Sequence, residues 1–425
     1  MRNAIARSLV IVVLSATALA LPACGGEDAA EPVAVTNADD VAVVAAGNTA
    51  FALDLYGRVA ATAGNVFISP TSVSTALTMT WAGARGNTAT EMATVLHLPS
   101  IGATGDEPSR NPDRIAASFG TLERGLAASP ETRGYELHTA NSLWGQEGYT
   151  FLDAYTAMLD RHFGAGMNRV DFMNDTEGAR LTINEWVAKK TEDRIRDLIP
   201  EGLLDPSTTL VLTNAVYFKG NWASQFDEAA TKKEPFHGSK GESPVRMMHQ
   251  KGTFGYVEAD GVQVLDLPYE GDELSMTVVL PADDYDGGLS ALEAKLTPEL
   301  LDSWRSGLVE REVAVALPRF TMTWGTEDLT THLKALGMRD AFVYRTADFS
   351  GIDGRTVLFI SHVLHKAFID VNEEGTEAAA ATAVVLKRES IRAPVFRADR
   401  PFLFMIRDRA TGSVLFMGRL ADPAA

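Results

Sequence analysis

The sequence predicts an α+β fold in which helices and strands are segregated along the chain. Segments with apolar residues at helical spacing dominate the first half, whereas alternating or short continuous apolar runs dominate the second half. Between residues 47 and 425 no linker, internal repeat or break in composition divides the chain. We therefore expect one α+β domain over residues 47–425, with helices packed on a large β-sheet.

Five helices are expected from the spacing of apolar residues. They cover Ala50–Ala61, Ser69–Trp81, Thr88–Leu96, Phe151–Arg161 and Thr176–Thr191. The last helix has a clear start signal, because Asn174 and Asp175 precede it and Glu177 places an acid in its first turn. By contrast, residues 106–133 hold four arginines diluted by acids, prolines and glycines, and they predict a solvated surface.

Six strands are expected in the second half from alternation and from short apolar runs. They cover Leu210–Phe218, Val262–Pro268, Leu274–Leu280, Glu312–Leu317, His362–Val371 and Phe402–Arg407. The alternation is clearest in the fourth, where Val313, Val315 and Leu317 share one face.

The first 46 residues are expected to lie outside the domain. Met1–Arg7 carries two arginines and Ser8–Leu21 is apolar, which predicts a secretion signal over residues 1–23. Cys24 is the only cysteine and stands where a bacterial lipoprotein signal places its lipidated cysteine, although an ordinary signal peptide is the alternative. Residues 24–46 would then be the lipidated cysteine and a flexible tether, of about 25 Å. The expected location is therefore outside the cytoplasm, with lipid holding the protein to the bacterial cell envelope.

Charge and motifs exclude several classes of function. A net charge of −18 argues against nucleic acid and anionic lipid as partners of the domain itself. The chain has no Gly-x-Ser-x-Gly, no His-Glu-x-x-His, no phosphate-binding glycine loop and no cysteine pair for zinc. We therefore expect no enzyme activity, no metal site and no cofactor.

The most informative segment lies near the C-terminus, at residues 373–385. Gly375 follows two glutamates and precedes small and β-branched residues without proline or aromatic side chains. In an extended conformation the residues from Thr376 to Val384 alternate, with small or apolar side chains on one face and Glu377 on the other. The alternatives are a plain helix, which alanine favours, or a loop without a function.

This segment resembles the reactive-loop hinge of serpins, in which the loop inserts into a β-sheet. Five further segments are similar to serpin motifs in the family's order: Asn65–Val73, Gly83–Thr88 with Glu91-Met92, Leu212–Trp222, Phe396–Ile406 and Leu415–Arg419. The resemblance implies the serpin fold, with helices on a large central mixed or antiparallel sheet, two smaller sheets and an exposed reactive-centre loop.

The resemblance also implies a function. A serpin of this kind inhibits serine proteases, with cysteine proteases as a further target class, by loop cleavage, acyl-enzyme formation and loop insertion. The partner is the target protease in a covalent complex with a monomeric inhibitor. No polyanion cofactor is expected, because residues 106–133 lack a strongly basic helix. The alternative is a non-inhibitory serpin that acts as a surface binding or chaperone-like protein.

Individual residues carry over from the family pattern. The hinge comprises Glu373, Gly375, Thr376, Glu377, Ala378, Ala379, Ala380, Ala381 and Thr382. Ser69, Ser72, Asn214 and His365 match the polar cluster beneath the strands that part, although Ser69 and Ser72 also suit a helix start. Trp222 matches the tryptophan at the top of the opening, and Arg319 matches a basic residue that pairs with Glu373.

The bond that is cut has two candidates. The family's usual spacing from Gly375 places Glu389 before the bond and Ser390 after it, so that Gly375–Glu389 is a stretch of 15 residues. A shift by one residue gives Arg388-Glu389, which suits trypsin-like enzymes because their pocket aspartate pairs with a basic side chain. The extended stretch from Gly375 to Glu389 spans about 50 Å, close to the roughly 55 Å diameter of a compact domain of this size.

Overall fold

The computed structural model describes residues 38–101, 110–126, 134–164, 166–375 and 393–423. Within these ranges the helices are α1 Ala38–Val59, α2 Pro70–Trp81, α3 Gly86–Val95, α4 Pro112–Leu126, α6 Asp153–Phe163, α7 Thr176–Lys190, α8 Gly288–Glu293, α9 Pro298–Gly307, α10 Thr330–Leu336 and α11 Ser350–Asp353, with 3-10 turns η1 Glu228–Ala230 and η2 Asp340–Phe342. The strands are β1 Val66–Ile68, β2 Tyr135–Gln146, β3 Met167–Val170, β4 Leu210–Gly220, β5 Lys232–Gly238, β6 Gly241–Ala259, β7 Val262–Pro268, β8 Leu274–Pro281, β9 Val309–Pro318, β10 Phe320–Asp328, β11 His362–Val371, β12 Val395–Arg397, β13 Phe402–Asp408 and β14 Val414–Leu420.

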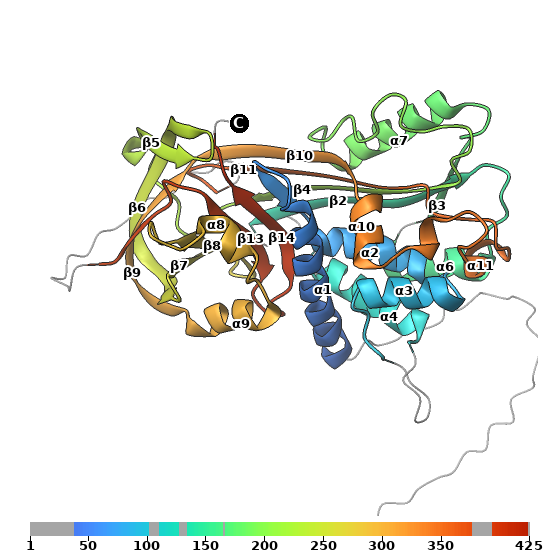
Figure 1. The fold of residues 1–425 in the computed structure, drawn as a ribbon, viewed down its shortest axis with the longest axis horizontal. Helices are drawn as coiled ribbons and strands as arrows, with labels where there is room; N and C mark the ends of the chain where they lie inside the picture. Colours follow the sequence, from blue (N-terminus) through green and yellow to red (C-terminus); the bar gives the residue numbers. More distant parts are fainter. Residues whose placement is uncertain (1–37, 102–109, 127–133, 165, 376–392, 424–425) are drawn as a thin grey trace, which may run out of the picture. The chain divides into compact units, whose positions relative to one another are not determined.

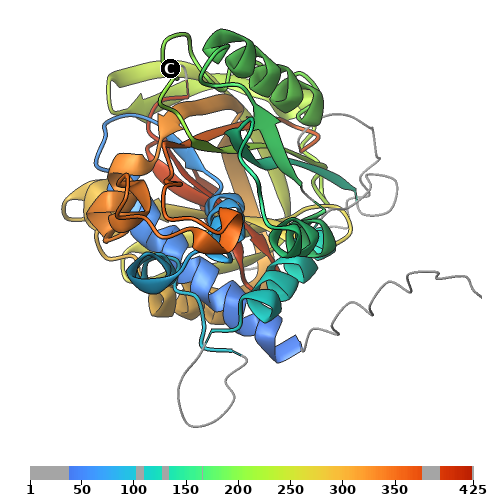
Figure 2. The same ribbon diagram turned by 90° about the vertical axis from the view of Figure 1, so that its right-hand side faces the viewer.

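The described strands form a mixed five-stranded sheet and a nine-stranded sheet (Figure 1). The five-stranded sheet has the order β10-β11-β4-β2-β3. Its two central strands, β11 and β4, are parallel neighbours, whereas β10 is antiparallel to β11 and β2 is antiparallel to β4. This sheet lies between α7 on one face and α2 with the other N-terminal helices on the opposite face, as the turned view also shows (Figure 2).

The nine-stranded sheet runs β1-β14-β13-β8-β7-β6-β9-β12, with β5 paired to β6. Strand β6 is 19 residues long and pairs with β5 at its start and with β7 at its end. Strand β6 therefore joins two groups of strands into one sheet. The resemblance to serpins led us to expect these groups as two separate smaller sheets. Phe67 of β1 stacks on Phe404 and Phe416 at ring distances of 5.7 and 5.3 Å, which packs these strands into the core.

Each of the five expected helices is present, with α1, α2, α3, α6 and α7 at the expected places. The start signal of α7 is confirmed, because Asp175 Oδ1 accepts a hydrogen bond from Gly178 N at 3.0 Å. The expected solvated surface over residues 106–133 needs a correction, since residues 112–126 form α4. Its Ile115, Phe119, Leu122 and Leu126 are buried along one helical face.

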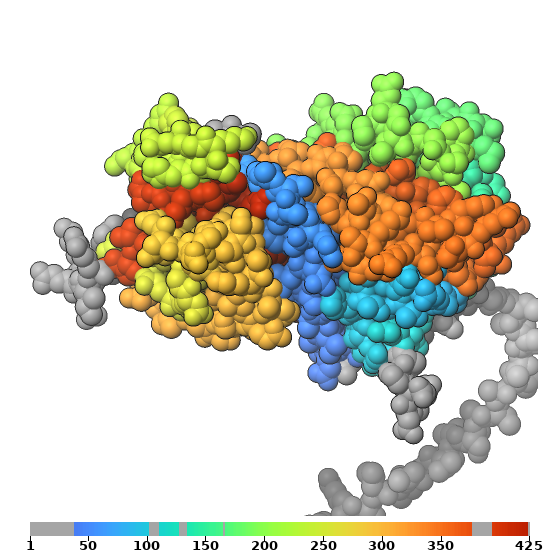
Figure 3. All heavy atoms as spheres, viewed as in Figure 1, coloured from blue at the N-terminus to red at the C-terminus, as the bar shows by residue number. Residues whose placement is uncertain are grey.

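The expected tether also needs a correction at its C-terminal end. Residues 38–46 are the first turns of α1, and Val44 and Ala45 are buried there. Asp40 near the start of this helix pairs with Arg114 of α4 at 2.7 Å. Apolar packing therefore extends the helix nine residues before the expected domain boundary. Figure 3 shows α1 in blue at the surface, between the gold and red segments on one side and the orange and cyan segments on the other. Within the described ranges no helix has the length and hydropathy to span a bilayer.

Candidate functional site

The boundary between β4 and β11, which we call the seam, is the feature around which the predicted residues gather. The two strands pair in parallel from His362 with Val211 to Ile369 with Phe218. Almost every β4 residue is buried, so the seam is enclosed along its length. A strand that entered between two parallel strands in the opposite direction would be antiparallel to both, which is the more stable pairing.

A group of five residues, which we call the polar cluster, crosses the seam at mid-length. It comprises Ser69, Ser72, Asn141, Asn214 and His365. Asn214 of β4 donates to Ser72 Oγ at 2.6 Å and also donates to Asn141 Oδ1. His365 Nδ1 lies 2.5 Å from Asn214 Oδ1, and His365 Nε2 accepts from Ser69 N at 3.2 Å. The structure therefore brings together all four residues that the sequence placed here.

His365 is neutral in this cluster. Its side chain is fully buried, and burial lowers the pKa of the imidazole to about 3. Because the Ser69 amide donates to Nε2, the proton lies on Nδ1 and points at Asn214. The bond between His365 and Asn214 is thus a directed link across the seam.

The top of the seam, which we call the entrance, is formed by Trp222, Arg246, Arg319, Glu373 and Gly375. After β11 the chain turns, and Gly375 N and O both bond to Asn372 while a bridge joins Gly375 to Asn221 just beyond β4. Gly375 has a φ of 125°, and a Cβ there would lie 2.3 Å from Gly220 O. Only glycine fits this close approach. Gly375 therefore lies between Asn221, which follows β4, and Asn372, which follows β11.

Trp222 closes the entrance from the side of β4. Its ring stacks on Tyr269 at 4.7 Å, and its Nε1 donates to Asn372 O at 3.0 Å. Its backbone N also donates to Glu374 O at 3.0 Å. Trp222 therefore holds the turn at residues 372–375, which contains the first hinge residues, against the end of β4.

Glu373 lies at the centre of the entrance with two arginines. The carboxylate is 1% exposed, with Arg319 Nη1 at 3.3 Å from Oε2 and Arg246 Nη2 at 3.5 Å from Oε1. The sequence indicated Arg319 as a partner, with the weak stabilisation typical of an exposed pair. The buried carboxylate changes that expectation, because a buried charge depends on its partners more strongly.

Sequence reasoning missed Arg246 and Asn141. Arg246 lies in β6, which was not expected, and its role depends on the β6–β9 register that brings it beside Arg319. Asn141 lies in β2, where Asn141 pairs with Asn214 in the strand register. The polar residues of β2 obscure the alternation that would have identified the strand, so only the pairing reveals the residue.

Comparison with known proteins identifies the family. The profile of the family described as Serpin (serine protease inhibitor) matches residues 46–423. The chain belongs to the serpin family. The human leukocyte elastase inhibitor is 40% identical over 395 residues, which cover 89% of this chain and 99% of that protein. An uncharacterized serpin-like protein of Thermococcus kodakarensis is 42% identical over 380 residues, which cover 88% of this chain and 84% of that protein.

Solved structures agree with this assignment. Uncleaved ovalbumin superimposes with a TM-score of 0.78 at 30% identity, covering 89% of this chain and all of that chain. The serpin fold expected from the sequence is thereby confirmed, with the two smaller sheets joined through β6.

Several residues of the predicted lipidation site, hinge and reactive bond lie outside the described ranges. These are Cys24, Thr376, Glu377, Ala378, Ala379, Ala380, Ala381, Thr382, Arg388, Glu389 and Ser390. Their roles stay predictions. The described residues hold no group of three His, Cys, Asp or Glu side chains arranged to bind a metal.

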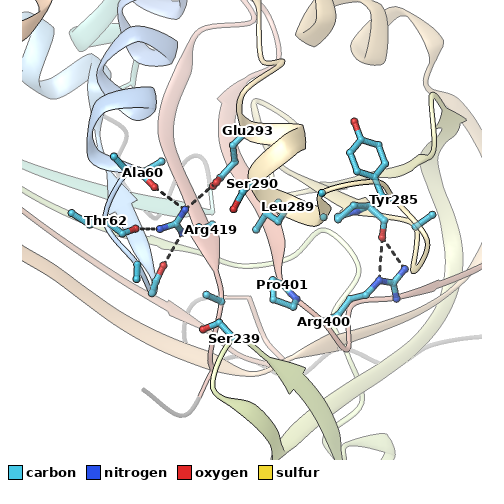
Figure 4. Close-up of a pocket in the computed structure, with 18 of the residues that line it drawn as sticks. Ala60, Thr62, Ser239, Tyr285, Leu289, Ser290, Glu293, Arg400, Pro401 and Arg419 are labelled. Carbon is cyan, nitrogen blue, oxygen red and sulfur yellow. Dashed lines mark hydrogen bonds and ion pairs between the residues drawn. The ribbon is translucent and has the colours of Figure 1, made fainter.

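A cleft of about 520 Å³ opens away from the seam, between the end of α1 and α8 (Figure 4). Its two arginines are engaged within the protein. Arg419 donates to the carbonyls of Ala60, Thr62 and Gly64 and pairs with Glu293 at 2.9 Å. Arg400 donates twice to Pro281 O. The contacts of Arg419 tie β14 to α8 and to the segment that follows α1, and those of Arg400 reach the end of β8, so in this serpin they stabilise the fold.

Proposed function

We propose that this serpin inhibits serine proteases, with cysteine proteases as a further target class, as a suicide substrate whose cut loop enters the seam. One observation carries the proposal: the chain turns at Gly375 and is bridged to Asn221, so the hinge begins between the ends of two parallel strands. The human relative is named for inhibiting leukocyte elastase, which supports the same activity here.

The bridge at Gly375 also supplies a register for insertion. The antiparallel bridge joins Gly375 to Asn221, and a strand that continued in this register would pair backwards along β4. The resulting pairs are Ala378 with Phe218, Ala380 with Val216, Thr382 with Asn214, and Val384 with Leu212. Because cross-strand partners share a face, the small residues of the hinge would enter the buried face.

The same register explains the alternation of the hinge. Phe218, Val216 and Leu212 belong to the hydrophobic core, so small partners cause the least displacement there. Thr382 would arrive opposite Asn214, where the new strand separates Asn214 from His365. Its hydroxyl both donates and accepts, so it can replace the lost partner.

The chemistry requires only the target's own nucleophile. Its serine hydroxyl adds to the carbonyl carbon of Glu389, the bond to Ser390 breaks, and the new amino group of Ser390 leaves with a proton. Glu389 is then joined to the protease as an ester. If the cut loop inserts before water hydrolyses that ester, the loop carries the attached protease along the sheet. The intact protein must therefore be kinetically trapped short of its most stable state.

The activity is tested by incubating the protein with glutamate-specific, trypsin-like, elastase-like and chymotrypsin-like proteases. We expect a complex that survives detergent and heat with at least one of them. Mass spectrometry of the released C-terminal fragment then locates the bond: a start at Ser390 indicates Glu389-Ser390, and a start at Glu389 indicates Arg388-Glu389. Cleavage by every protease without any stable complex would instead indicate a non-inhibitory serpin.

For location, we propose an exported protein that is lipid-anchored through Cys24 to a bacterial cell envelope. The charged and apolar segments of residues 1–21 and the single cysteine support this proposal. Acyl chains on one cysteine would hold the protein at a membrane without any spanning helix.

A further inference from the structure

Glu123 of α4 is linked to the seam by an unbroken series of hydrogen bonds, which we call the relay. Asn141 Nδ2 donates to Glu123 Oε1 at 3.3 Å, and Asn141 Oδ1 accepts from Asn214 Nδ2. Asn214 Oδ1 accepts from His365 Nδ1, and His365 Nε2 accepts from the Ser69 amide. The relay thus begins at a half-buried carboxylate beside β2 and crosses the seam at the bond between Asn214 and His365.

The two ends of the relay determine which atom donates at every step. The Ser69 amide can only donate, so His365 Nε2 must accept and Nδ1 must carry the proton. An ionised carboxylate can only accept, so Asn141 must present its NH₂ group to Glu123 and its oxygen to Asn214. With both ends fixed, one orientation of each amide satisfies every bond.

Protonation of Glu123 removes this constraint. A carboxylic acid both donates and accepts, so Asn141 can then present either end of its amide. In the inverted orientation Asn214 must turn its NH₂ group toward His365 Nδ1, which already carries a proton. An ionised Glu123 also polarises the hydrogen bonds of the relay and strengthens each of them by about 10–30%. Protonation of Glu123 therefore weakens the bond between Asn214 and His365 across the seam.

We propose that Glu123 is a positioning residue whose ionised carboxylate strengthens the closed seam and makes the opening of the seam dependent on pH. Its consequence for inhibition rests on the proposed function, since easier opening favours loop insertion. The effect on the seam itself belongs to the closed protein and is measurable without any protease.

The position of Glu123 makes this titration relevant near neutral pH. Burial raises the pKa of Glu123 to about 7. The charged groups around it are Arg124 on the same helix and Lys190 of α7, which lines the same cleft of about 310 Å³. On α6, the imidazole Nε2 of His162 lies 2.8 Å from Asp113 Oδ1. The described residues of α2, β2 and β14 that line the adjoining cavity carry no other titratable group: Ser69, Thr71, Ser72, Leu137, Thr139, Leu415 and Phe416.

The test is amide hydrogen exchange of β4 and β11 in the full chain, compared between wild type and Glu123→Gln at the same pH. This comparison cancels the intrinsic pH dependence of exchange. At pH 8.5 we expect faster exchange in Glu123→Gln, by about threefold to tenfold, at those seam amides whose exchange is insensitive to low urea and therefore reports local opening of the seam; this is the change expected from one ordinary hydrogen bond. Amides that exchange only through global unfolding are scored separately, because burial raises the pKa of Glu123 and its ionisation therefore lowers the stability of the folded protein as a whole. At pH 5.5 the two proteins should exchange at the same rate, because wild-type Glu123 is then also neutral.

Glu136→Gln is the matched control. Glu136 lies in β2, the strand that holds Asn141, but it pairs with His138 and Lys219 outside the relay. This variant should match wild type at both pH values. Equal exchange of Glu123→Gln and wild type at pH 8.5 would overturn the proposal, and so would a difference that persists unchanged at pH 5.5.

The inference and the proposed function fail separately. Detergent-stable protease complexes without a pH-dependent difference in exchange remove only the role of Glu123. A pH-dependent difference in exchange without any such complex removes only the inhibitory function.

Discussion

At the residue scale, the neutral state of His365 has a measurable effect on stability. The pKa of His365 falls from 6.5 to about 3 on folding, so between these values the unfolded chain binds a proton that the native protein does not. The contribution of His365 to the free energy of unfolding is therefore at its full value above pH 6.5. It decreases as the pH falls, by up to about 1.4 kcal/mol per pH unit. We expect the stability advantage of wild type over His365→Gln to shrink between pH 7.5 and pH 5 in urea unfolding.

The comparison between variant and wild type isolates this effect. Burial raises the pKa of Glu123, so that group has the opposite sign and stabilises the native protein as pH falls from about 7. Both proteins contain Glu123, so its contribution cancels in the difference between their free energies of unfolding. An advantage that stays constant from pH 7.5 to pH 5 would mean that His365 is not held neutral.

The orientation of hinge side chains predicts a second effect at this scale. Thr376→Arg should turn the inhibitor into a substrate, because the inserted strand would bury an unpaired charge. Glu377→Arg is the control, since residue 377 would lie on the outer face in the same register. Cleavage should persist in both, and the ratio of cleaved protein to complex should rise at least about tenfold in Thr376→Arg alone, the factor for 1.4 kcal/mol. Similar ratios for both variants would contradict the proposed register.

The sequence predicted some site residues and not others for a physical reason. Ser69, Ser72, Asn214 and His365 lie in local motifs, and the structure joins them by hydrogen bonds. Glu123 and Asn141 lie in no such motif. They reach the site through tertiary packing of α4 on β2, which local spacing does not reveal.

At the element scale, the turn that follows β11 depends on two arginines rather than one, because both pair with Glu373. Arg246→Gln or Arg319→Gln alone should lower the free energy of unfolding by about 1 kcal/mol or less, because both arginines are partly exposed. The double variant should lose about 2–3 kcal/mol, because Glu373 is then buried without a cation. Urea unfolding of the three variants measures by how much the loss of unfolding free energy in the double variant exceeds the sum of the losses in the two single variants.

A Glu373→Gln background provides the control for this cycle. Without the carboxylate, removal of either arginine should be nearly neutral and the two effects should add. Simple additivity in the presence of Glu373 would show that the two arginines do not share its charge.

Three of the elements that the sequence missed, β2, β6 and α4, have a common feature. The helices and strands that were expected have uninterrupted apolar periodicity, as in β4 and β13. In contrast, β2 and β6 carry polar residues on partly exposed faces, and α4 combines a buried stripe with charged residues. Their structure is set by neighbouring strands and helices, which is information that a local window does not contain.

At the scale of the whole molecule, the family resemblance predicted the fold class and the sheet into which the loop would insert. It did not predict the strand pairing that joins the smaller sheets through β6 or the early start of α1. Both depend on long-range packing. The hydrogen-bonded path of the nine-stranded sheet spans residues from Val66 to Leu420.

The N-terminal segment predicts an attachment that concerns the whole molecule. Expressed in a bacterial host that modifies lipoproteins, the full chain should enter the detergent phase on phase partition, whereas Cys24→Ser should stay in the aqueous phase. Two or more acyl chains give stable membrane attachment, and one does not. Equal partition of both proteins into the aqueous phase would contradict lipidation.

The central claim is that the cut loop becomes a strand between β4 and β11. Insertion would add hydrogen bonds along the full seam and release the kinetically trapped state. The most direct measurement is the thermal midpoint of unfolding before and after a single cleavage near Glu389, with both fragments retained. The account predicts a cleaved protein that unfolds far above the midpoint of the intact protein, whereas an unchanged or lower midpoint would contradict it.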